Sequence, residues 1–235
     1  MSAANNQLLL ISSCYSAPPT DYSFLEMSCR NVGITLHPYG VGDAWPGFTK
    51  RLQGAVDYIK NRSEDIVMFL DSADTFVLDP AEVIVEKFKS NGGGFLFSSE
   101  KNCWPDSTLA HYTPYSYPPW KYLNAGGWIA RRDTAVDFLT QVLAKYGAIY
   151  PEDDTRCFVQ WWLDEPMDYC LDIDNTCDIF QSMYMHVDGE IDWTTFRNTV
   201  TNTTPSSFHF NGRAPGREMV YARAISAGRV KLCTT

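Results

Sequence analysis

The sequence has little positive charge and no long apolar run. Its 235 residues contain 19 Lys and Arg against 28 Asp and Glu, a formal net charge of −9, and no basic cluster is longer than Arg131-Arg132. Such an acidic surface repels phosphate backbones, which disfavours nucleic acid as a partner. No apolar run approaches the roughly 20 residues that a membrane-spanning helix needs. We therefore expect neither nucleic-acid binding nor a membrane span.

The seven cysteines form no CxxC pair and their number is odd, which argues against a disulfide framework and against a structural zinc site. We expect most of them to be reduced thiols in the core. The first apolar run, residues 8–11, follows Asn5-Asn6 and lacks the architecture of a signal peptide. As written, the chain is expected to be cytoplasmic, and secretory only if it is a fragment of a larger protein.

What the sequence does contain is a rich supply of core residues, with 45% hydrophobic and 14% aromatic side chains. We find no repeat, low-complexity tract or linker, so one domain over residues 1–235 is expected. Apolar runs predict strands at 7–13, 34–39, 66–70 and 94–98 and near 128, 171 and 208, and helical spacing predicts helices at 20–31, 49–61, 80–90 and 133–146, after 154 and after 216. This alternation is typical of an α/β fold with a mostly parallel central sheet flanked by helices.

Asp71 and Asp74 directly follow the predicted strand at 66–70. Ligands of such sheets lie beyond the carboxyl ends of the strands, where two carboxylates suit a hard divalent cation that in turn binds a diphosphate. DxxD is a weak motif, however. The alternative is that one aspartate caps the next turn and the other is solvated.

Asp153-Asp154 stand just before a predicted helix. Acidic residues at a helix start complement the helix dipole, and position alone favours that structural role. The functional alternative is that the pair holds sugar hydroxyls or takes a proton from an acceptor hydroxyl. His209 is ambiguous in the same way, because a lone histidine is more often structural, whereas one beside Asn211-Gly212 at a strand end faces a cleft.

A compact polar cluster follows the strand predicted at 94–98, and a glycine pair comes after it. Glu100, Cys103 and Trp104 could close a loop over the core, or hold a sugar ring through the Trp face and hydrogen bonds. In Asn124-Ala125-Gly126-Gly127 the two glycines allow the backbone to approach a ligand closely. Each of these motifs is ambiguous when taken singly.

Their order along the chain is far more specific. It runs Asp71-Ser72-Ala73-Asp74, Ser99-Glu100 with Cys103-Trp104-Pro105, Tyr122-Leu123-Asn124-Ala125-Gly126-Gly127, Asp153-Asp154, Asp174 with Ile179-Phe180-Gln181, and His209 with Asn211-Gly212. This series closely resembles the glycosyltransferase domain of the procollagen lysyl hydroxylases and its stand-alone relatives, over about residues 7–216.

The resemblance implies a Rossmann-like GT-A fold and transfer of a hexose from a UDP-sugar, with Mn²⁺, or alternatively Mg²⁺, on the diphosphate. It implies that Asp71, Asp74 and His209 are the metal ligands. Residues implied at the donor are Ser13, Tyr15, Trp45, Lys50, Asp71, Ala73, Asp74, Cys103, Trp104, Gly126, Gly127, Asn211 and Gly212. Residues implied at the donor sugar and acceptor, with catalytic roles, are Glu100, Asn124, Asp153 and Asp154.

This sequence departs from the family pattern in three places. Ala73 stands where the family has an aromatic residue that resembles a stacking platform for uracil, so that another ring such as Tyr15 would have to substitute. The loop over residues 40–50 is short and lacks a glycine run. Thr155 stands where a glutamine usually follows the aspartate pair, which leaves the donor sugar open. The hydroxylase domains of the animal enzymes are absent, and lysine hydroxylation is not expected of this chain.

The resulting hypothesis is an Mn²⁺-dependent transferase that moves galactose or glucose from a UDP-sugar to a hydroxyl group of a glycan or of a hydroxylated protein side chain. One alternative is a catalytically silent module of the same fold that binds a UDP-sugar or glycan, and another is a hydrolase that passes the sugar to water. The two metal aspartates, His209 and the Asp153-Asp154 pair favour the transferase.

Overall fold

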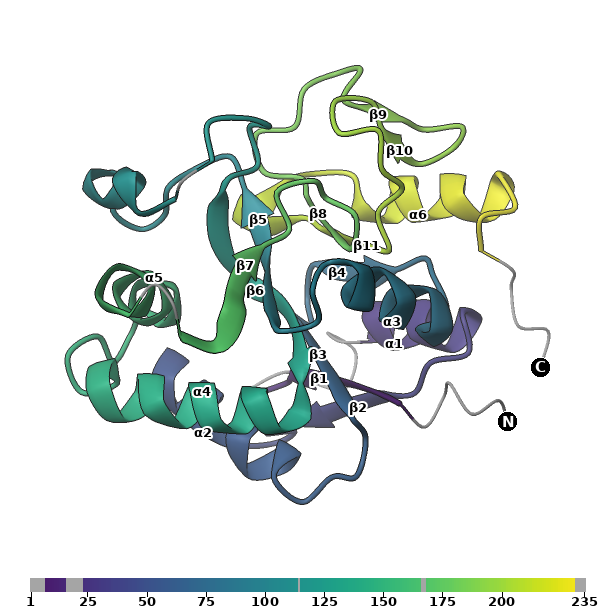
Figure 1. The fold of residues 1–235 in the computed structure, drawn as a ribbon. Helices are drawn as coiled ribbons and strands as arrows, with labels where there is room; N and C mark the ends of the chain where they lie inside the picture. Colours follow the sequence, from purple (N-terminus) through teal and green to yellow (C-terminus); the bar gives the residue numbers. More distant parts are fainter. Residues whose placement is uncertain (1–6, 16–22, 114, 166–167, 231–235) are drawn as a thin grey trace.

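The chain folds around a central sheet in which nearly all strands run the same way (Figure 1). The structure is a computed structural model that describes residues 7–15, 23–113, 115–165 and 168–230. Within them the sheet order is β2-β1-β3-β6-β5-β7, with β6 alone antiparallel to its neighbours. The strands are β1 (Leu8–Ser13), β2 (Leu36–Tyr39), β3 (Ile66–Leu70), β5 (Phe95–Glu100), β6 (Tyr122–Arg131) and β7 (Leu171–Ile173). This confirms the expected α/β class with a mostly parallel sheet.

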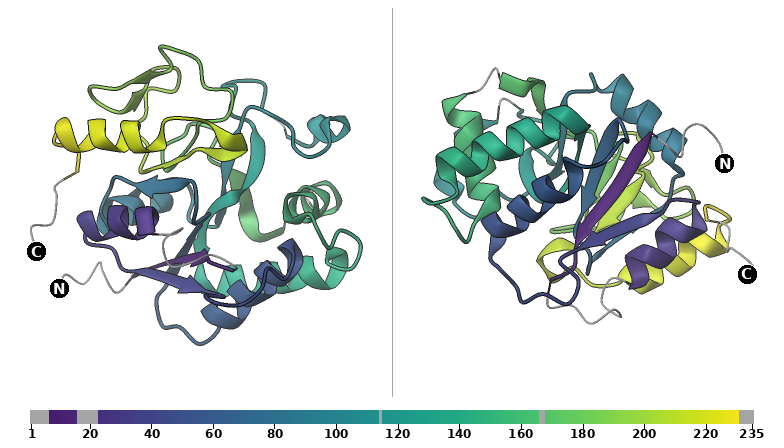
Figure 2. Two further views of the ribbon diagram at one scale, coloured as in Figure 1. Left: turned by 180° about the vertical axis from the view of Figure 1, so that it is seen from behind. Right: turned by 90° about the horizontal axis from the view of Figure 1, so that it is seen from below.

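Helices cover both faces of this sheet (Figures 1 and 2). One face carries α2 (Phe48–Ile59), α4 (Arg132–Tyr146) and α5 (Asp154–Asp164), and the other carries α1 (Ser23–Asn31) and α3 (Ala81–Ser90). Alternate residues of each strand pack into one layer or the other, as Leu9 and Leu10 do. Burial on both faces explains why these strands read as continuous apolar runs.

A smaller sheet of order β4-β11-β8 lies beside the central one and packs against α6 (Arg217–Ser226) (Figure 1). Its strands are β4 (Thr75–Val77), β8 (Phe180–Ser182) and β11 (Ser207–His209). A two-stranded ribbon of β9 (Ile191–Asp192) and β10 (Arg197–Asn198) lies between β8 and β11 in the chain. In this small sheet β4, which directly follows β3, pairs with β11, which lies more than 100 residues later in the chain.

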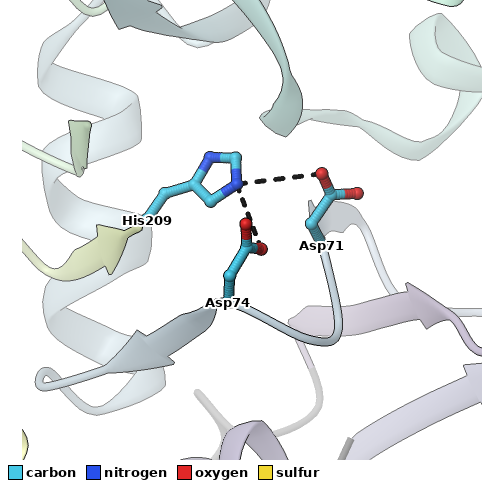
Figure 3. Close-up of side chains that lie close together, drawn as sticks. All are labelled: Asp71, Asp74 and His209. Carbon is cyan, nitrogen blue, oxygen red and sulfur yellow. Dashed lines mark ion pairs between the residues drawn. The ribbon is translucent and has the colours of Figure 1, made fainter. Parts of the chain in front are cut away.

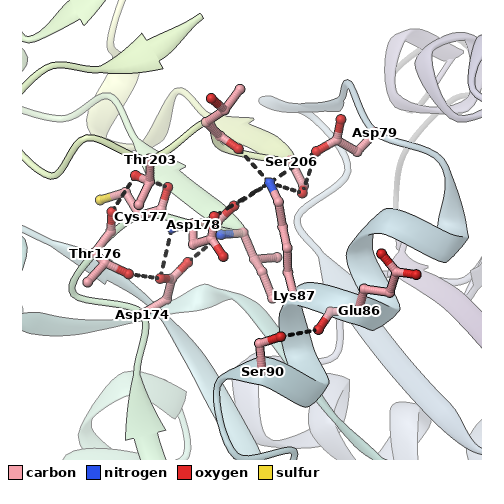
Figure 4. A network of polar contacts seen from close by, with 12 residues as sticks. Asp79, Glu86, Lys87, Ser90, Asp174, Thr176, Cys177, Asp178, Thr203 and Ser206 are labelled. Carbon is pink, nitrogen blue, oxygen red and sulfur yellow. Dashed lines mark hydrogen bonds and ion pairs between the residues drawn. The ribbon is translucent and has the colours of Figure 1, made fainter.

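Buried and partly buried polar contacts connect the small sheet to α3 and to the segment after β7 (Figure 4). The Lys87 ammonium of α3 donates to the Asp178 carbonyl oxygen at 2.9 Å and to Ser206 Oγ at 3.1 Å. The buried Asp174 carboxylate accepts the backbone N–H groups of Ile179 (2.7 Å) and Phe180 (2.8 Å). Since buried polar groups need partners, these bonds fix the paths into β8 and β11. Asp174 of the family motif therefore supports the fold.

Two predicted strands differ from those in the structure. The strand expected near residue 128 as part of a parallel pattern is the ten-residue β6, which runs antiparallel between β3 and β5. Its Asn124, Gly126 and Gly127 break the apolar pattern, but Asn124 still pairs with Ser98 of β5, Gly127 pairs with Leu70 of β3, and the Gly126 carbonyl oxygen accepts the Asp71 N–H. The strand expected from residue 34 begins at Leu36, and residues 20–22 of the first predicted helix lie outside the described residues.

The expectations for thiols and membrane spans can be compared with the structure only at the described residues. There, no helix has both the length and the apolar character needed to cross a membrane. Six cysteines in this part of the chain are free thiols, of which Cys170 is exposed and the others are buried, as expected. Cys233 lies outside the described residues.

Candidate active site

Polar side chains converge where β1, β3 and β5 end. β3 stops at Leu70 and is followed by Asp71, while β5 ends in Glu100. Carboxyl ends of strands that run the same way meet at one sheet edge, which is where ligands of α/β proteins bind. A cavity of about 460 Å³ opens at this edge, and its walls include Asp71, Asp74, Glu100, Asn124, Asp154 and His209.

Asp71, Asp74 and His209 form a tight group in this cavity (Figure 3). His209 Nε2 lies 3.2 Å from Asp74 Oδ1 and 3.8 Å from Asp71 Oδ2, and one potential ligand atom from each residue lies within 4.8 Å of the others. Burial alone would lower the pKa of the His209 imidazole, but the neighbouring carboxylates outweigh it and the pKa is raised. This group could hold a divalent cation.

Strand pairing brings His209 to the two aspartates across more than 130 residues of sequence. β11 pairs antiparallel with β4, and His209 lies opposite Thr75, the residue after Asp74. The Phe210 N–H also donates to the Asp74 carbonyl oxygen at 2.8 Å. The grouping therefore depends on the register of the small sheet.

Two local features fit this group to a metal ion. Among the described residues, neither ring nitrogen of the buried His209 makes a hydrogen bond of good geometry, and Nε2 instead faces the Asp74 and Asp71 carboxylates, so that a cation between these three side chains would complete the site. Gly126 lies against the group, and a Cβ there would come within 2.3 Å of His209 Cε1 and 2.6 Å of Asp71 Oδ2. The register with β5 shifts at this glycine, because Phe97 pairs with Trp128 and Ser98 pairs with Asn124, which leaves residues 125–127 of β6 as a bulge. Bulges often re-aim residues next to active sites.

Arg51 of α2 links Asp71 to Asp154. Its Nη1 donates to Asp71 Oδ1 at 2.7 Å, and its Nη2 donates to Asp154 Oδ2. The Arg51 side chain is 7% exposed, and its guanidinium lies over the Phe48 and Phe69 rings. Burial favours loss of its proton, but the two carboxylates outweigh this and raise the Arg51 pKa. A permanent positive charge therefore lies within the site.

Glu100 is held by two amide side chains on the floor of the cavity. Asn124 Nδ2 donates to Glu100 Oε1 at 2.9 Å and Asn211 Nδ2 donates to Oε2 at 3.3 Å. Burial raises the pKa of the Glu100 carboxyl to about 7, although both amide bonds oppose the shift. Near neutral pH this group can therefore donate or accept a proton.

The adjacent aspartates at the start of α5 have different surroundings. Asp153 caps the helix, since its carboxylate accepts the Arg156 N–H at 2.8 Å, and it does not line the cavity. Burial, followed by the charge of Asp154, raises the pKa of Asp153. Asp154 is buried, faces the cavity and pairs with Arg51. The geometry thus favours the helix-capping interpretation for Asp153 and a place in the site for Asp154.

A second, smaller cavity of about 270 Å³ lies on the other side of the acidic group. Its walls are formed by Ser13, Tyr15, Trp45, Arg51, Asp71, Ser72, Ala73 and Asp74. The rings of Tyr15 and Trp45 meet edge to face, with centroids 6.1 Å apart. Arg51, Asp71 and Asp74 line both cavities, so these three charged residues form the boundary between them.

The other residues expected in the site differ in where they lie. Trp104 is 61% exposed at the wall of the larger cavity, where Gly212 also lies. Cys103 is buried, with Sγ 3.3 Å from the Asp106 carbonyl oxygen, and lines neither cavity. Lys50 is exposed on α2 and also lines neither cavity. Gly127 packs against the core, because a Cβ there would lie 3.1 Å from Phe180 Cδ1 and Ser98 Cβ.

Arg51 is the charged residue that the sequence analysis missed. It lies four residues before Ala55 and eight before Ile59, on the buried face of α2. A charge on the apolar face of a helix indicates a buried ion pair, because an unpaired buried charge is very costly. This signal was present in the sequence, but it does not identify the partners.

Comparison with known proteins agrees with the family suggested by the motifs. Residues 5–217 match the family described as "PLOD GT domain". The "Procollagen-lysine,2-oxoglutarate 5-dioxygenase" of Drosophila melanogaster is 30% identical over 215 residues, which are 83% of this chain and 29% of that protein. The "Multifunctional procollagen lysine hydroxylase and glycosyltransferase LH3" of Homo sapiens is 25% identical over 226 residues, 88% of this chain and 30% of that protein. The chain therefore spans less than a third of the length of these relatives.

The fold is also similar to that of a solved glycosyltransferase. The galactosyltransferase LgtC, crystallised with donor and acceptor sugar analogues, superimposes with a TM-score of 0.55. The match covers 97% of this chain and 96% of LgtC at 13% sequence identity. At that identity the likeness concerns the fold alone, and it confirms the expected GT-A architecture.

Proposed function

Because the chain belongs to the family of PLOD glycosyltransferase domains, we propose that it transfers a hexose from a UDP-sugar in a reaction that depends on Mn²⁺. Galactose and glucose are the donor sugars we favour, because the ordered motifs of this family imply a hexose donor. The acceptor is a hydroxyl group of a glycan or of a hydroxylated protein side chain. The name of the human relative, a lysine hydroxylase and glycosyltransferase, supports the second acceptor class.

The observation that carries this proposal is the position of the metal-ligating group between two cavities. A nucleotide-sugar has an aromatic base at one end, a sugar at the other and a diphosphate between them. The smaller cavity offers the rings of Tyr15 and Trp45 to the base. The larger cavity offers carboxylates and amides to the sugar and acceptor. The diphosphate then crosses the boundary at Asp71 and Asp74, where a cation is needed.

The donor atoms suit Mn²⁺. Carboxylates are preferred ligands of Mg²⁺ and Mn²⁺, and the added imidazole of His209 favours the transition metal. A bound Mn²⁺ supplies Lewis-acid stabilisation of the charge that grows on the leaving UDP. Asp71, Asp74 and His209 hold this ion, and Arg51 adds a fixed positive charge at the same boundary.

The remaining groups act on the sugar and the acceptor. Asp154 faces the larger cavity, where its carboxylate accepts a hydrogen bond from a sugar or acceptor hydroxyl. Glu100, whose pKa is raised to about 7 by burial, exchanges hydrogen bonds with the donor sugar while Asn124 and Asn211 hold it in place. Asp153 acts indirectly, because it caps the helix that carries Asp154.

UDP release from a panel of UDP-hexoses tests the proposal. The protein is incubated with each donor, with Mn²⁺ or Mg²⁺ or EDTA, and with and without glycan and hydroxylysine-peptide acceptors. We expect metal-dependent release that rises when an acceptor is present, together with a glycosylated product. If the same amount of UDP is released with and without acceptor, and free hexose is the product, the protein is a hydrolase. UDP-sugar binding without any release would identify a silent binding module.

A further inference from the structure

Arg51 joins two carboxylates that come from distant parts of the chain. Asp71 follows β3 and Asp154 begins α5, 83 residues later, and the guanidinium of α2 bonds both. The three side chains lie against the larger cavity. The Arg51 and Asp154 side chains are 7% and 6% exposed, so this contact is largely shielded from water. One side chain therefore connects the metal-ligating group to the part of the cavity assigned to the sugar and acceptor.

The two oxygens of Asp71 have separate partners. Oδ1 accepts from Arg51 Nη1 at 2.7 Å, whereas Oδ2 faces His209 Nε2 at 3.8 Å. A carboxylate held by one oxygen presents the other in a fixed direction. Groups that hold metal ligands from behind in this way commonly change metal affinity by about 10- to 100-fold when they are mutated.

We propose that Arg51 is a positioning residue that fixes the Asp71 carboxylate toward the cation and the Asp154 carboxylate toward the sugar and acceptor. This inference rests on the proposed function, because it assigns Asp71 to a metal ion. The planar guanidinium is suited to the task, since its separate N–H groups bond two carboxylates at a defined angle. A lysine ammonium has the same charge but lacks this fork.

Arg51→Lys separates positioning from simple neutralisation of charge, because it keeps the charge and removes the fork. Mn²⁺ alone is titrated into the full chain without donor, by calorimetry or by electron paramagnetic resonance. We expect Arg51→Lys to weaken Mn²⁺ binding about tenfold or more. The matched control is Arg62→Lys, which removes a second two-armed guanidinium, bonded to Glu64 at the end of α2 and absent from both cavities. It should bind Mn²⁺ as the wild type does.

Asp154→Asn provides a second test that keeps Arg51 in place, in case Arg51→Lys does not fold. Asp154 is not a metal ligand, so its loss acts on the metal through Arg51. Without this anionic partner the second arm of the guanidinium is no longer held, so Arg51 no longer fixes the Asp71 carboxylate at a defined angle. We expect weaker Mn²⁺ binding in Asp154→Asn, but not in Asp164→Asn, which removes the same charge from the other end of α5.

The rate of transfer at saturating Mn²⁺ tests the second half of the inference. Arg51→Lys should still have a lowered kcat under these conditions, because excess metal does not restore the hold on Asp154. A kcat that returns to the wild-type value would overturn the link to Asp154, and unchanged Mn²⁺ affinity in both Arg51→Lys and Asp154→Asn would overturn the link to Asp71. If the wild type itself binds no Mn²⁺, the proposed function fails and this inference fails with it.

Discussion

Gly126→Ala should damage the proposed metal site of Asp71, Asp74 and His209 while leaving the backbone of β6 in place. The new methyl group would lie 2.3 Å from His209 Cε1 and 2.6 Å from Asp71 Oδ2, whereas ordinary contact begins at 3.4 Å. The imidazole or the carboxylate must therefore move by about 1 Å. Misplacement of about 1 Å can cost roughly 100-fold in rate. We expect Mn²⁺ affinity to fall about 10- to 100-fold and metal-dependent UDP release to fall by about 100-fold.

Gly127→Ala is the matched control, because the same methyl group is added one residue later, on the other face of β6. Its Cβ would lie 3.1 Å from Phe180 Cδ1 and Ser98 Cβ, away from the metal-ligating group. Overpacking of this kind typically costs about 1–3 kcal/mol of stability. We expect a lower melting temperature in Gly127→Ala with Mn²⁺ affinity preserved. Calorimetric titration and thermal unfolding of both variants are the measurements, and wild-type Mn²⁺ affinity in Gly126→Ala would refute the reasoning.

Three further predictions concern single side chains. Asp74→Ala removes a proposed metal ligand and should abolish metal-dependent UDP release while thermal unfolding remains cooperative, and activity like that of the wild type would contradict the metal assignment. Ala73→Tyr should tighten UDP binding by about 1 kcal/mol if base stacking is the missing contribution, as measured by calorimetry; unchanged affinity would mean that Tyr15 or Trp45 already supplies the contact. Glu100→Gln should change the pH dependence of stability. Burial raises the Glu100 pKa from 4.5 to about 7, so ionisation costs the folded state nothing below pH 4.5 and up to roughly 3 kcal/mol above pH 7. The melting temperature of metal-free Glu100→Gln relative to the wild type should therefore rise between pH 4.5 and pH 8, and a constant difference would contradict the raised pKa.

The local sequence pattern does not distinguish the roles of Asp153 and Asp154. Both residues fit a helix start equally well, and both belong to the same motif. In the structure Asp153 caps α5, while Asp154 turns into the cavity and meets Arg51. The sequence could not separate them, because the difference arises from a partner about 100 residues earlier in the chain.

Lys50 and Arg51 illustrate the same limit on the donor side. The resemblance implied a role for Lys50, but that side chain is exposed and lines neither cavity. The next residue, Arg51, is buried between the two cavities. Adjacent helical residues differ in direction by about 100°, and only packing against the sheet decides which of them enters the site.

Local sequence patterns were enough to predict most helices and strands and the edge of the sheet where chemistry is expected. Apolar runs and helical spacing depend on neighbours within a few residues, so the strand before Asp71 and the helix containing Arg51 are visible without a structure. The ordered motifs also carried the family. Which distant residues meet became visible only in the folded chain. β6 lies antiparallel in the central sheet, and the pairing of β4 with β11 brings His209 to Asp74. Such contacts depend on strand pairing and packing across the whole chain, and no local pattern encodes them.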